Sequence, residues 1–232
     1  SIYQHDPVHF LNTCEIMISN GDTLKRTEYT YPFDRQTDAA MKRLTDDNRI
    51  AVPVEVREKS DGSLKQVSHE YALFGSTPRL SAVRRNTGTN GKLEMRMTCH
   101  KYDSYGNPLY VSADGTGNMV FLWSYQGMYP VAKIVNATYE EVKAALGTAP
   151  ESLSSSSSPD TALIDGLRTK LGKAHVTTYT YKPQVGLLTE TSPAGTTTYY
   201  GYDNFGRLSE VWMLEGLSRK VLQSYEYNYV NP

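Results

Sequence analysis

The chain has 232 residues, which fits one large β domain or two small domains. Its 24 Lys and Arg residues balance 25 Asp and Glu residues, and the resulting net charge of -1 argues against nucleic acid or an anionic membrane surface as a partner. The apolar runs are shorter than the roughly 20 residues of a membrane-spanning helix, so we expect no membrane insertion in this segment. The sequence begins SIYQHDP, without Met, and we expect it to be a piece of a longer protein.

Tyrosine dominates the aromatic residues, with 18 Tyr against 5 Phe and 2 Trp. Tyrosine favours half-buried strand positions, where the ring packs and the hydroxyl reaches water or a backbone group. The two cysteines, Cys14 and Cys99, are too few for a disulfide scaffold or a four-ligand zinc site. Their spacing leaves open whether they pair with each other.

The first hundred residues read as short strands separated by turns. Asn20-Gly21 and Asp61-Gly62 supply the positive φ angles of tight turns and predict two hairpins. Asn90-Gly91 predicts a third turn, between LSAVRRN and KLEMRMTCHKY. Pro53 cannot donate a backbone hydrogen bond, so its strand over residues 50–59 is expected at a sheet edge.

Helical patterns interrupt the strands in three places, near residues 37–47, 138–146 and 160–171. Thr37 is a candidate N-cap of the first helix, and Thr138 with Glu141 forms a capping-box pattern at the start of the second. Pro159 lies near the start of the third.

A Ser-rich stretch separates the second and third helices. Its five consecutive serines cannot bury apolar area, so residues 152–158 are expected to form a flexible loop. We therefore expect one β domain over residues 1–232 in which residues 137–173 form a helical insertion whose apolar faces lie on the sheet.

A sequence unit occurs twice, as HKYDSYGNPLYV in residues 100–111 and as YYGYDNFGRLSEV in residues 199–211. In each copy a Tyr ends the incoming strand, and Asp103 or Asp203 takes the first position of a turn, where its carboxylate can accept backbone N–H bonds. Gly106 or Gly206 follows three residues later, where a left-handed conformation can start the outgoing strand. The unit predicts a hairpin with a self-bonded corner.

Weaker copies flank these two. The stretch from Thr177 to Gly195 keeps Tyr181 and Gly186 and lacks the Asp, and another Tyr occurs at Tyr227. The tyrosines recur at intervals of 21 to 25 residues, which indicates an array in which neighbouring hairpins bury each other.

The stretches YGYDNFGRL and KYDSYGNPL resemble the YD repeats of the Rhs family of bacterial secreted and cell-surface proteins, most closely over residues 98–228. The resemblance implies a mainly β fold, in which antiparallel hairpin (YD) repeats form a twisted, curved sheet that is a section of an Rhs-type shell. It also implies a scaffold that encloses or displays a variable, toxin-like C-terminal domain, with the remainder of the parent chain as partner. The repeat-motif residues are Tyr102, Asp103, Gly106, Tyr181, Gly186, Tyr202, Asp203, Gly206, Arg207 and Leu208.

The residues do not predict an active site, and we expect no catalytic, cofactor-binding or metal-binding residue in this segment. The stretch HDPVH places His5, Asp6 and His9 together, but Pro7 opposes the helix on which an i, i+4 histidine pair binds metal. His100 follows Cys99 on an expected strand, where adjacent side chains point to opposite faces.

The alternative function is an adhesion module that binds a surface glycan or a protein through exposed rows of tyrosines. The more common arrangement argues against this alternative, because cross-strand aromatic rings usually pack on one another.

Overall fold

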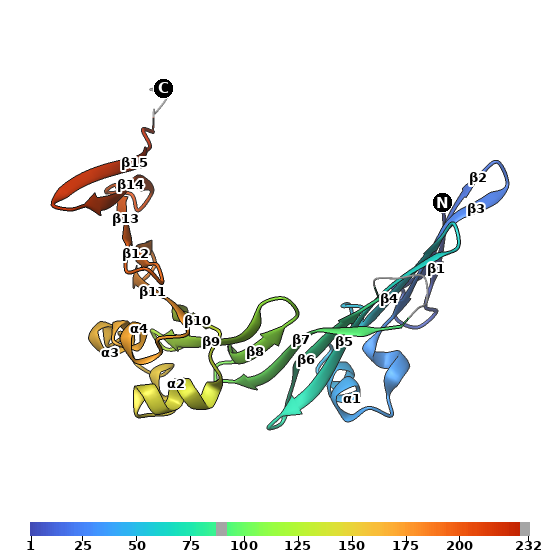
Figure 1. The fold of residues 1–232 in the computed structure, drawn as a ribbon. Helices are drawn as coiled ribbons and strands as arrows, with labels where there is room; N and C mark the ends of the chain where they lie inside the picture. The colour runs from blue at the N-terminus through green and yellow to red at the C-terminus, as the bar shows by residue number, and fades with distance from the viewer. Residues whose placement is uncertain (87–91, 228–232) are drawn as a thin grey trace. The chain divides into compact units, whose positions relative to one another are not determined.

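The computed structural model describes residues 1–86 and 92–227, and within them fifteen strands form one sheet in the order of the sequence (Figure 1). The pairs with a defined register are all antiparallel, and the mainly β, antiparallel fold is confirmed. The strands are β1 Ile2–His5, β2 Asn12–Ser19, β3 Asp22–Thr30, β4 Glu55–Ser60, β5 Ser63–Phe74, β6 Thr77–Arg85, β7 Glu94–Tyr102, β8 Pro108–Ala113, β9 Gly117–Ser124, β10 Tyr129–Val135, β11 His175–Lys182, β12 Gly186–Thr191, β13 Thr197–Tyr202, β14 Leu208–Glu215 and β15 Ser218–Ser224.

The helices are short. They are η1 Pro32–Arg35, α1 Ala39–Asp46, α2 Tyr139–Leu146, η2 Pro150–Leu153, α3 Thr161–Asp165 and α4 Leu167–Lys170, where η denotes a 3-10 helix. None of the helices within the described ranges has the length and apolar character needed to cross a lipid bilayer. The chain forms two compact units, Ser1–His100 with Ser112–Asp114, and Lys101–Val111 with Gly115–Pro232.

The first unit is built on two tight hairpins. Asn20 and Gly21 have φ angles of 52° and 87° between β2 and β3, and Asp61 and Gly62 have φ angles of 44° and 71° between β4 and β5, so both predicted turns are confirmed. The predicted turn at Asn90-Gly91 lies outside the described residues.

Helix α1 covers one face of the first unit. Met41 and Leu44 of this helix are buried against Val54, and Tyr71 of β5 packs on the same cluster. The N-cap is Asp38, whose carboxylate accepts hydrogen bonds from the backbone N–H groups of Ala40 and Met41. The prediction of Thr37 as N-cap is therefore wrong, because the helix begins at Ala39.

The prediction of an edge strand at Pro53 is also wrong. Strand β4 begins at Glu55 and pairs with β3 on one side and β5 on the other, so it is internal. Pro53 precedes the strand, where its missing N–H removes no ladder bond. The two cysteines of this unit, Cys14 and Cys99, are buried free thiols.

In the second unit, helices α2, α3 and α4 cover one face of strands β9 to β11 (Figure 1). Val142 and Leu146 of α2, with Ile164 and Leu167 of the later helices, enter the same buried cluster as Val176 of β11. This cluster is the largest core of the described residues, and it includes Val120, Leu122, Val131 and Ile134 of β9 and β10. The apolar helix faces therefore lie on the sheet.

The ends of α2 follow the sequence prediction. The Thr138 hydroxyl accepts a bond from the Glu141 backbone N–H, and the Glu141 carboxylate accepts one from the Thr138 N–H at 2.8 Å. Gly147 ends the helix at a φ of 75°.

Two predictions between α2 and β11 need correction. The expected single helix at 160–171 is broken into α3 and α4 at Gly166, and its N-cap is Asp160, which accepts a bond from Leu163 N–H. Glycine has low helix propensity, so the break falls there. The Ser-rich stretch is not a detached loop, because Ser154 is buried and the Ser156 carbonyl accepts a 2.8 Å bond from Gln126 N–H.

Candidate functional site

The two copies of the sequence unit lie at chain reversals with the same backbone geometry. Asp103 is in the turn between β7 and β8, and Asp203 is in the turn between β13 and β14. In each turn the aspartate carbonyl accepts a bond from the glycine three residues on, at 3.2 Å for Gly106 and 3.0 Å for Gly206. These glycines have φ angles of 98° and 75°, a region that L side chains rarely adopt.

Each aspartate side chain closes its own turn. One carboxylate oxygen of Asp103 accepts the backbone N–H of Asn107 at 2.7 Å, and the corresponding oxygen of Asp203 accepts that of Arg207 at 2.9 Å. The second oxygen bonds the side chain of the same residue, Asn107 Nδ2 at 3.1 Å or Arg207 Nε at 2.8 Å. We call this arrangement an aspartate corner.

The corner at Asp203 carries a full ion pair. Arg207 Nη2 lies 2.6 Å from the carboxylate, and the backbone N–H of Phe205 donates to the same group at 2.9 Å. These interactions, led by the Arg207 backbone hydrogen bond, lower the pKa of Asp203 below its ordinary value of 3.8.

A third corner has Ser192 in place of the aspartate. It joins β12 to β13. The Ser192 N–H donates to the Thr196 carbonyl, as each aspartate N–H does to the carbonyl four residues on. The Gly195 N–H donates to the Ser192 carbonyl, and the Thr196 N–H donates to the Ser192 hydroxyl at 3.2 Å. Gly195 has a φ of 84°. The sequence indicates this corner by the Ser at the first and the Gly at the fourth position of SPAG. A pattern that requires aspartate at the first position does not detect it.

A related loop, one residue longer, joins β1 to β2 in the first unit. The Asp6 carboxylate accepts the backbone N–H groups of Val8 and His9, and it lies 3.1 Å from His9 Nδ1. Phe10, with a φ of 59°, takes the left-handed position. The HDPVH stretch therefore forms a turn, and His9 stacks on Phe33 with ring centroids 4.1 Å apart.

The copy centred on Tyr181 differs from the other corners. The chain turns at the same distance from the tyrosine, from Lys182 to Gly186, but Gln184 takes the left-handed conformation at a φ of 65°, one residue before the position of the corner glycines. Gly186 begins β12 under the Tyr202 side chain, and a Cβ at that position would lie 2.3 Å from Tyr202 Oη. Glycine is therefore needed there for a close approach between neighbouring strands.

The remaining motif residues lie at strand ends. Tyr102 ends β7 and Tyr202 ends β13, where its hydroxyl donates to the Leu187 carbonyl at 2.9 Å. Leu208 begins β14, and its carbonyl accepts the Tyr227 hydroxyl at 2.8 Å. The tyrosines thus bond the backbone of neighbouring strands.

Three of the tyrosines form a cluster beside the helices. Tyr129 and Tyr181 stack at 4.7 Å, and Tyr125 meets both rings edge-on. The Tyr125 hydroxyl donates to the Tyr181 carbonyl at 3.2 Å. Burial in this cluster raises the pKa of Tyr181 to about 12.

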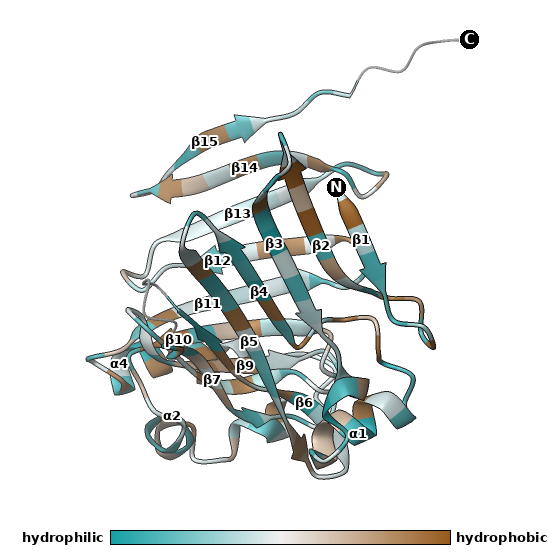
Figure 2. Ribbon diagram, turned by 90° about the vertical axis from the view of Figure 1, so that its right-hand side faces the viewer, coloured by the Kyte–Doolittle hydropathy of each residue, from teal (hydrophilic) through white to brown (hydrophobic). Residues whose placement is uncertain are grey.

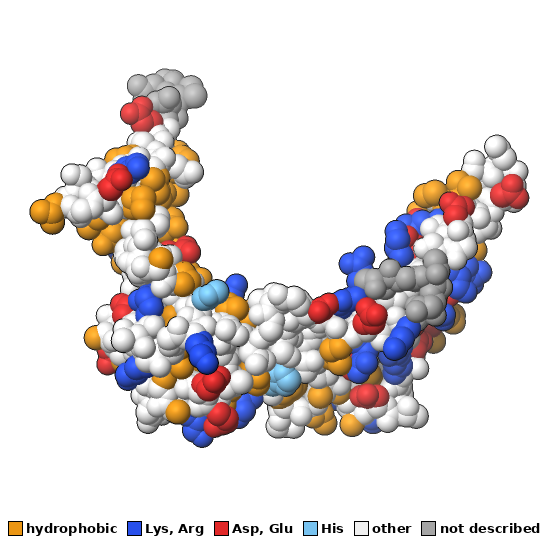
Figure 3. Space-filling view, viewed as in Figure 1, with side chains coloured by type: hydrophobic (Ala, Val, Ile, Leu, Met, Phe, Trp, Pro, Cys, Tyr) orange, Lys and Arg blue, Asp and Glu red, His pale blue; other side chains and the backbone are white. Residues whose placement is uncertain are grey.

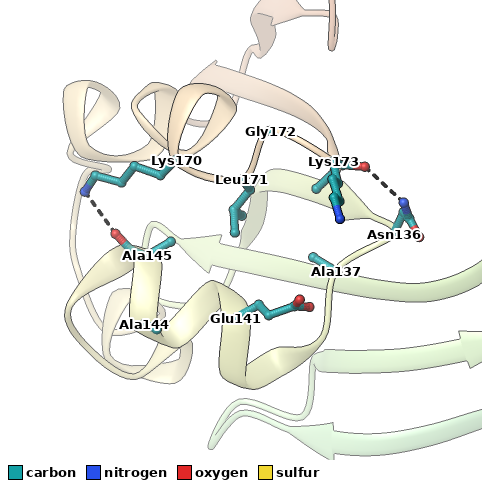
Figure 4. A pocket seen from close by; sticks show the side chains of 10 residues that line it. Asn136, Ala137, Glu141, Ala144, Ala145, Lys170, Leu171, Gly172 and Lys173 are labelled. Carbon is teal, nitrogen blue, oxygen red and sulfur yellow. Dashed lines mark hydrogen bonds between the residues drawn. The ribbon is translucent and has the colours of Figure 1, made fainter.

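A groove of about 620 Å³ lies between α2 and the segment after α4 (Figure 4). Lys173 and Glu141 line it from opposite sides, with Leu171 between them. Two of its polar side chains serve helix ends: Glu141 completes the capping box of α2, and Lys170 Nζ donates to the Ala145 carbonyl at 2.9 Å.

Metal-binding geometry is absent from residues 1–86 and 92–227, which contain no group of three or more His, Cys, Asp or Glu side chains that could hold an ion. His100 is on the opposite side of β7 from the buried Cys99, and its Nε2 lies 2.8 Å from Ser112 Oγ.

No protein-family model matches this chain, and no curated protein matches it. Chains similar to it occur in the crystal structures of TcdB2-TccC3 with Cdc42 (TM-score 0.45, 15% identity) and of TcdB2-TccC3 (TM-score 0.46, 14% identity). A third is the Photorhabdus luminescens Tc holotoxin pore with a TccC3 mutation (TM-score 0.45, 14% identity). Each similarity covers 94% of this chain and 12% of the other. With TM-scores this low, the likeness supports no conclusion about this chain, whose function is inferred from its own residues.

Proposed function

We propose that this chain is a structural scaffold segment, a single YD-repeat β domain over residues 1–232 that carries a helical insertion at residues 137–173. The observation that supports this proposal is the recurrence of one self-bonded corner at Asp103, Ser192 and Asp203. A side chain that is saturated by its own turn has little capacity left for a substrate, and it reverses the chain without help from a ligand.

The fold is stabilised as an array of hairpins, in which neighbouring hairpins stabilise each other. Each corner fixes the reversal locally, and each hairpin buries its side chains on the next, so that the surface grows by repetition. Tyrosine hydroxyls that bond carbonyls of neighbouring strands, as Tyr202 does with Leu187, tie successive hairpins together. On this view the segment performs no catalysis.

The YD resemblance extends the proposal to the parent protein. The segment forms part of the β-shell of a large bacterial Rhs-repeat protein, secreted or at the cell surface. That shell encloses or displays a variable, toxin-like C-terminal domain, and the partners of this segment are the further repeats and that domain.

The adhesion alternative requires rows of exposed tyrosines. The structure places Tyr125, Tyr129 and Tyr181 in a packed cluster, and Tyr199 stacks on Trp212 at 5.5 Å. These contacts favour rings that hold strands together over rings that are presented to a glycan.

Protease protection in the longest natural polypeptide that carries residues 1–232 tests the scaffold proposal. The region that follows this segment is expected to resist trypsin in the unaltered protein and to become cleavable when Asp103→Ala and Asp203→Ala are combined. A Glu140→Gln variant, on the exposed side of α2, is the matched control. Equal cleavage of this region in all three proteins would contradict the scaffold role.

A further inference from the structure

The two faces of strands β3, β4 and β5 differ in how their charges are balanced. On one face, the Glu58 carboxylate of β4 lies 2.6 Å from Lys25 Nζ of β3 and 3.5 Å from Lys65 Nζ of β5. Lys65 is directly opposite Glu58 in the register of the two strands. Both lysines on this face therefore have a carboxylate within ion-pair distance.

The opposite face carries three cations and one carboxylate. Arg26 of β3 is directly opposite Lys59 of β4, and Glu28 is directly opposite Arg57, so the four side chains share a face. We call these four residues the basic row, which has an excess of two positive charges. Figure 2 shows hydrophilic stretches on β3 and β4, and Figure 3 shows Lys and Arg side chains gathered over the strands of the first unit.

The charge of Arg57 is not matched within the basic row. Arg26 pairs with the carboxylate of the row, because Arg26 Nε lies 2.8 Å from Glu28 Oε1. Arg57 is half-buried, and its buried Nε has no hydrogen-bond partner within residues 1–86 and 92–227. Lys59 forms no ion pair in the same ranges. Two of the three cations therefore lack a counter-charge.

This arrangement costs stability in the absence of a ligand. A buried donor without a partner is unfavourable, and so are like charges placed directly opposite each other, as Arg26 and Lys59 are. Buried donors that a native protein leaves without partners point to a function or to a bound ion. An anion held by Arg57 and Lys59 removes both penalties.

A groove of about 430 Å³ lies beside the basic row, which is within the range of small-ligand sites of about 300–1,000 Å³. Arg26 and Lys59 line it, and Leu24 and Leu64 give it apolar surface. Hydroxyl groups also line it, those of Thr23, Ser60 and Ser63. Apolar side chains next to hydroxyls suit a sugar, whose ring has apolar C–H faces and polar edges.

We propose that the basic row and this groove bind a sugar phosphate. Arg57 and Lys59 hold the phosphate, and the sugar ring lies in the groove against Leu24 and Leu64. A phosphate monoester carries nearly two negative charges at pH 7, which balances the excess charge of the row. The guanidinium of Arg57 offers a planar fork of N–H donors that matches phosphate oxygens.

Isothermal titration of the full chain tests the proposal. The probes are glucose 6-phosphate and ribose 5-phosphate, and the controls are glucose, glucose 6-sulfate and inorganic phosphate. Both sugar phosphates are expected to bind more tightly than every control. Their affinity should fall as the pH is lowered through about 6, where a phosphate monoester loses its second charge. Glucose 6-sulfate keeps its single charge over this range, so its weaker binding should not change.

Variants of the chain locate the site. Arg57→Met and Lys59→Gln should each raise the Kd for glucose 6-phosphate by at least about tenfold, because each removes a charge-assisted hydrogen bond. Lys65→Gln is the matched control, since it removes a cation from the opposite face of the same hairpin, and it should leave the Kd unchanged. The NMR signal of the Arg57 Nε–H group should shift when glucose 6-phosphate binds, and binding without this shift would contradict the site.

The stability of the unliganded chain separates a binding role of Arg57 from a structural one. Met keeps an unbranched stem, so Arg57→Met removes the unpaired guanidinium and should raise the Tm in the absence of ligand. A lower Tm would mean that Arg57 holds the fold together, and it would overturn the proposal.

Two binding results would also overturn it. Equal affinity for glucose 6-phosphate and inorganic phosphate would indicate an adventitious ion only, and the second result is an absence of binding by both sugar phosphates. None of the binding residues belongs to an aspartate corner. A failure here therefore leaves the stability effects of the corners unchanged and is distinguishable from a failure of the scaffold proposal.

Discussion

Asp103 and Asp203 accept the same hydrogen bond from the residue four positions on, at 2.7 Å from Asn107 N–H and 2.9 Å from Arg207 N–H. The two corners differ in the outer contact of that fourth residue. Asn107 also donates to the Gly127 carbonyl at 2.8 Å, whereas Arg207 lies over the Tyr227 ring at 4.1 Å. The backbone of the corner is constant, and its outer side chain reaches the turn between β9 and β10 in one copy and the segment after β15 in the other.

Acid should destabilise the corner at Asp203. The pKa of this carboxyl is lowered in the folded chain, so its contribution to stability is present above the unfolded value near 3.8 and is lost as the pH falls below it. Thermal unfolding between pH 6 and pH 2.5 checks this, with Asp203→Asn as the comparison. The two proteins should differ in Tm at pH 6 and converge at low pH, and a constant difference would contradict the assignment.

Gly206 is required for its backbone conformation and not for space. Its φ is 75°, and the nearest atom to an added Cβ is Val185 Cγ1 at 4.0 Å. Gly206→Val should therefore cost about 1–3 kcal/mol in chemical denaturation. Gly206→Asn is the control, because Asn tolerates the left-handed region, and it should cost distinctly less. Equal losses would argue for a side-chain clash instead.

Gly127 is constrained both by its backbone conformation and by the space around it. Its φ is 76°, and an added Cβ would lie 2.5 Å from Tyr105 Cγ. Gly127→Ala should destabilise the chain by more than Gly206→Ala does, because the clash adds to the backbone strain. In the double variant with Tyr105→Ala only the strain should remain, and a double-mutant cycle of denaturation midpoints measures the difference. If the effects of the two substitutions on stability are additive, the Tyr105 ring does not pack on this turn.

Alkali should act through Tyr181. Burial raises its pKa from 10.0 to about 12, so the neutral phenol stabilises the fold below pH 10, and this contribution is lost as the pH rises through 12. Ultraviolet titration of phenolate formation should show a smaller late-ionising amplitude in Tyr181→Phe than in the unaltered chain, where the pKa of Tyr139 is also raised and that residue keeps contributing to the late step. Tyr3, which is 55% exposed, provides the control substitution Tyr3→Phe, which should leave the late step in place.

Local spacing predicts the aspartate corners because the bonds that define them lie within five residues. Contacts between hairpins are not local, so the packing of the Tyr105 ring on Gly127 could not be predicted from the sequence. The Tyr181 copy turns at the expected distance from its tyrosine, but the sequence pattern does not predict that Gln184, instead of a glycine, takes the left-handed conformation. The alternation of valines around Pro53 suggests a strand that in fact begins at Glu55.

The Ser192 corner, which an aspartate pattern does not detect, gives the sharpest test of the repeat. Its hydroxyl accepts the Thr196 N–H at 3.2 Å, where the carboxylates of the other corners accept the corresponding bond at 2.7 and 2.9 Å. Charge-assisted bonds are shorter and stronger than neutral ones, so Ser192→Asp should raise the Tm of the chain at pH 7. Ser192→Ala removes the acceptor and should cost about 0.5–1.5 kcal/mol. Ser155→Asp, in the Ser-rich stretch, is the matched control for added charge and should leave the Tm unchanged. If Ser192→Asp gives no gain, or if Ser155→Asp gives the same gain, the three turns do not share one mechanism, because an aspartate in this position stabilises a corner only by accepting the backbone bond.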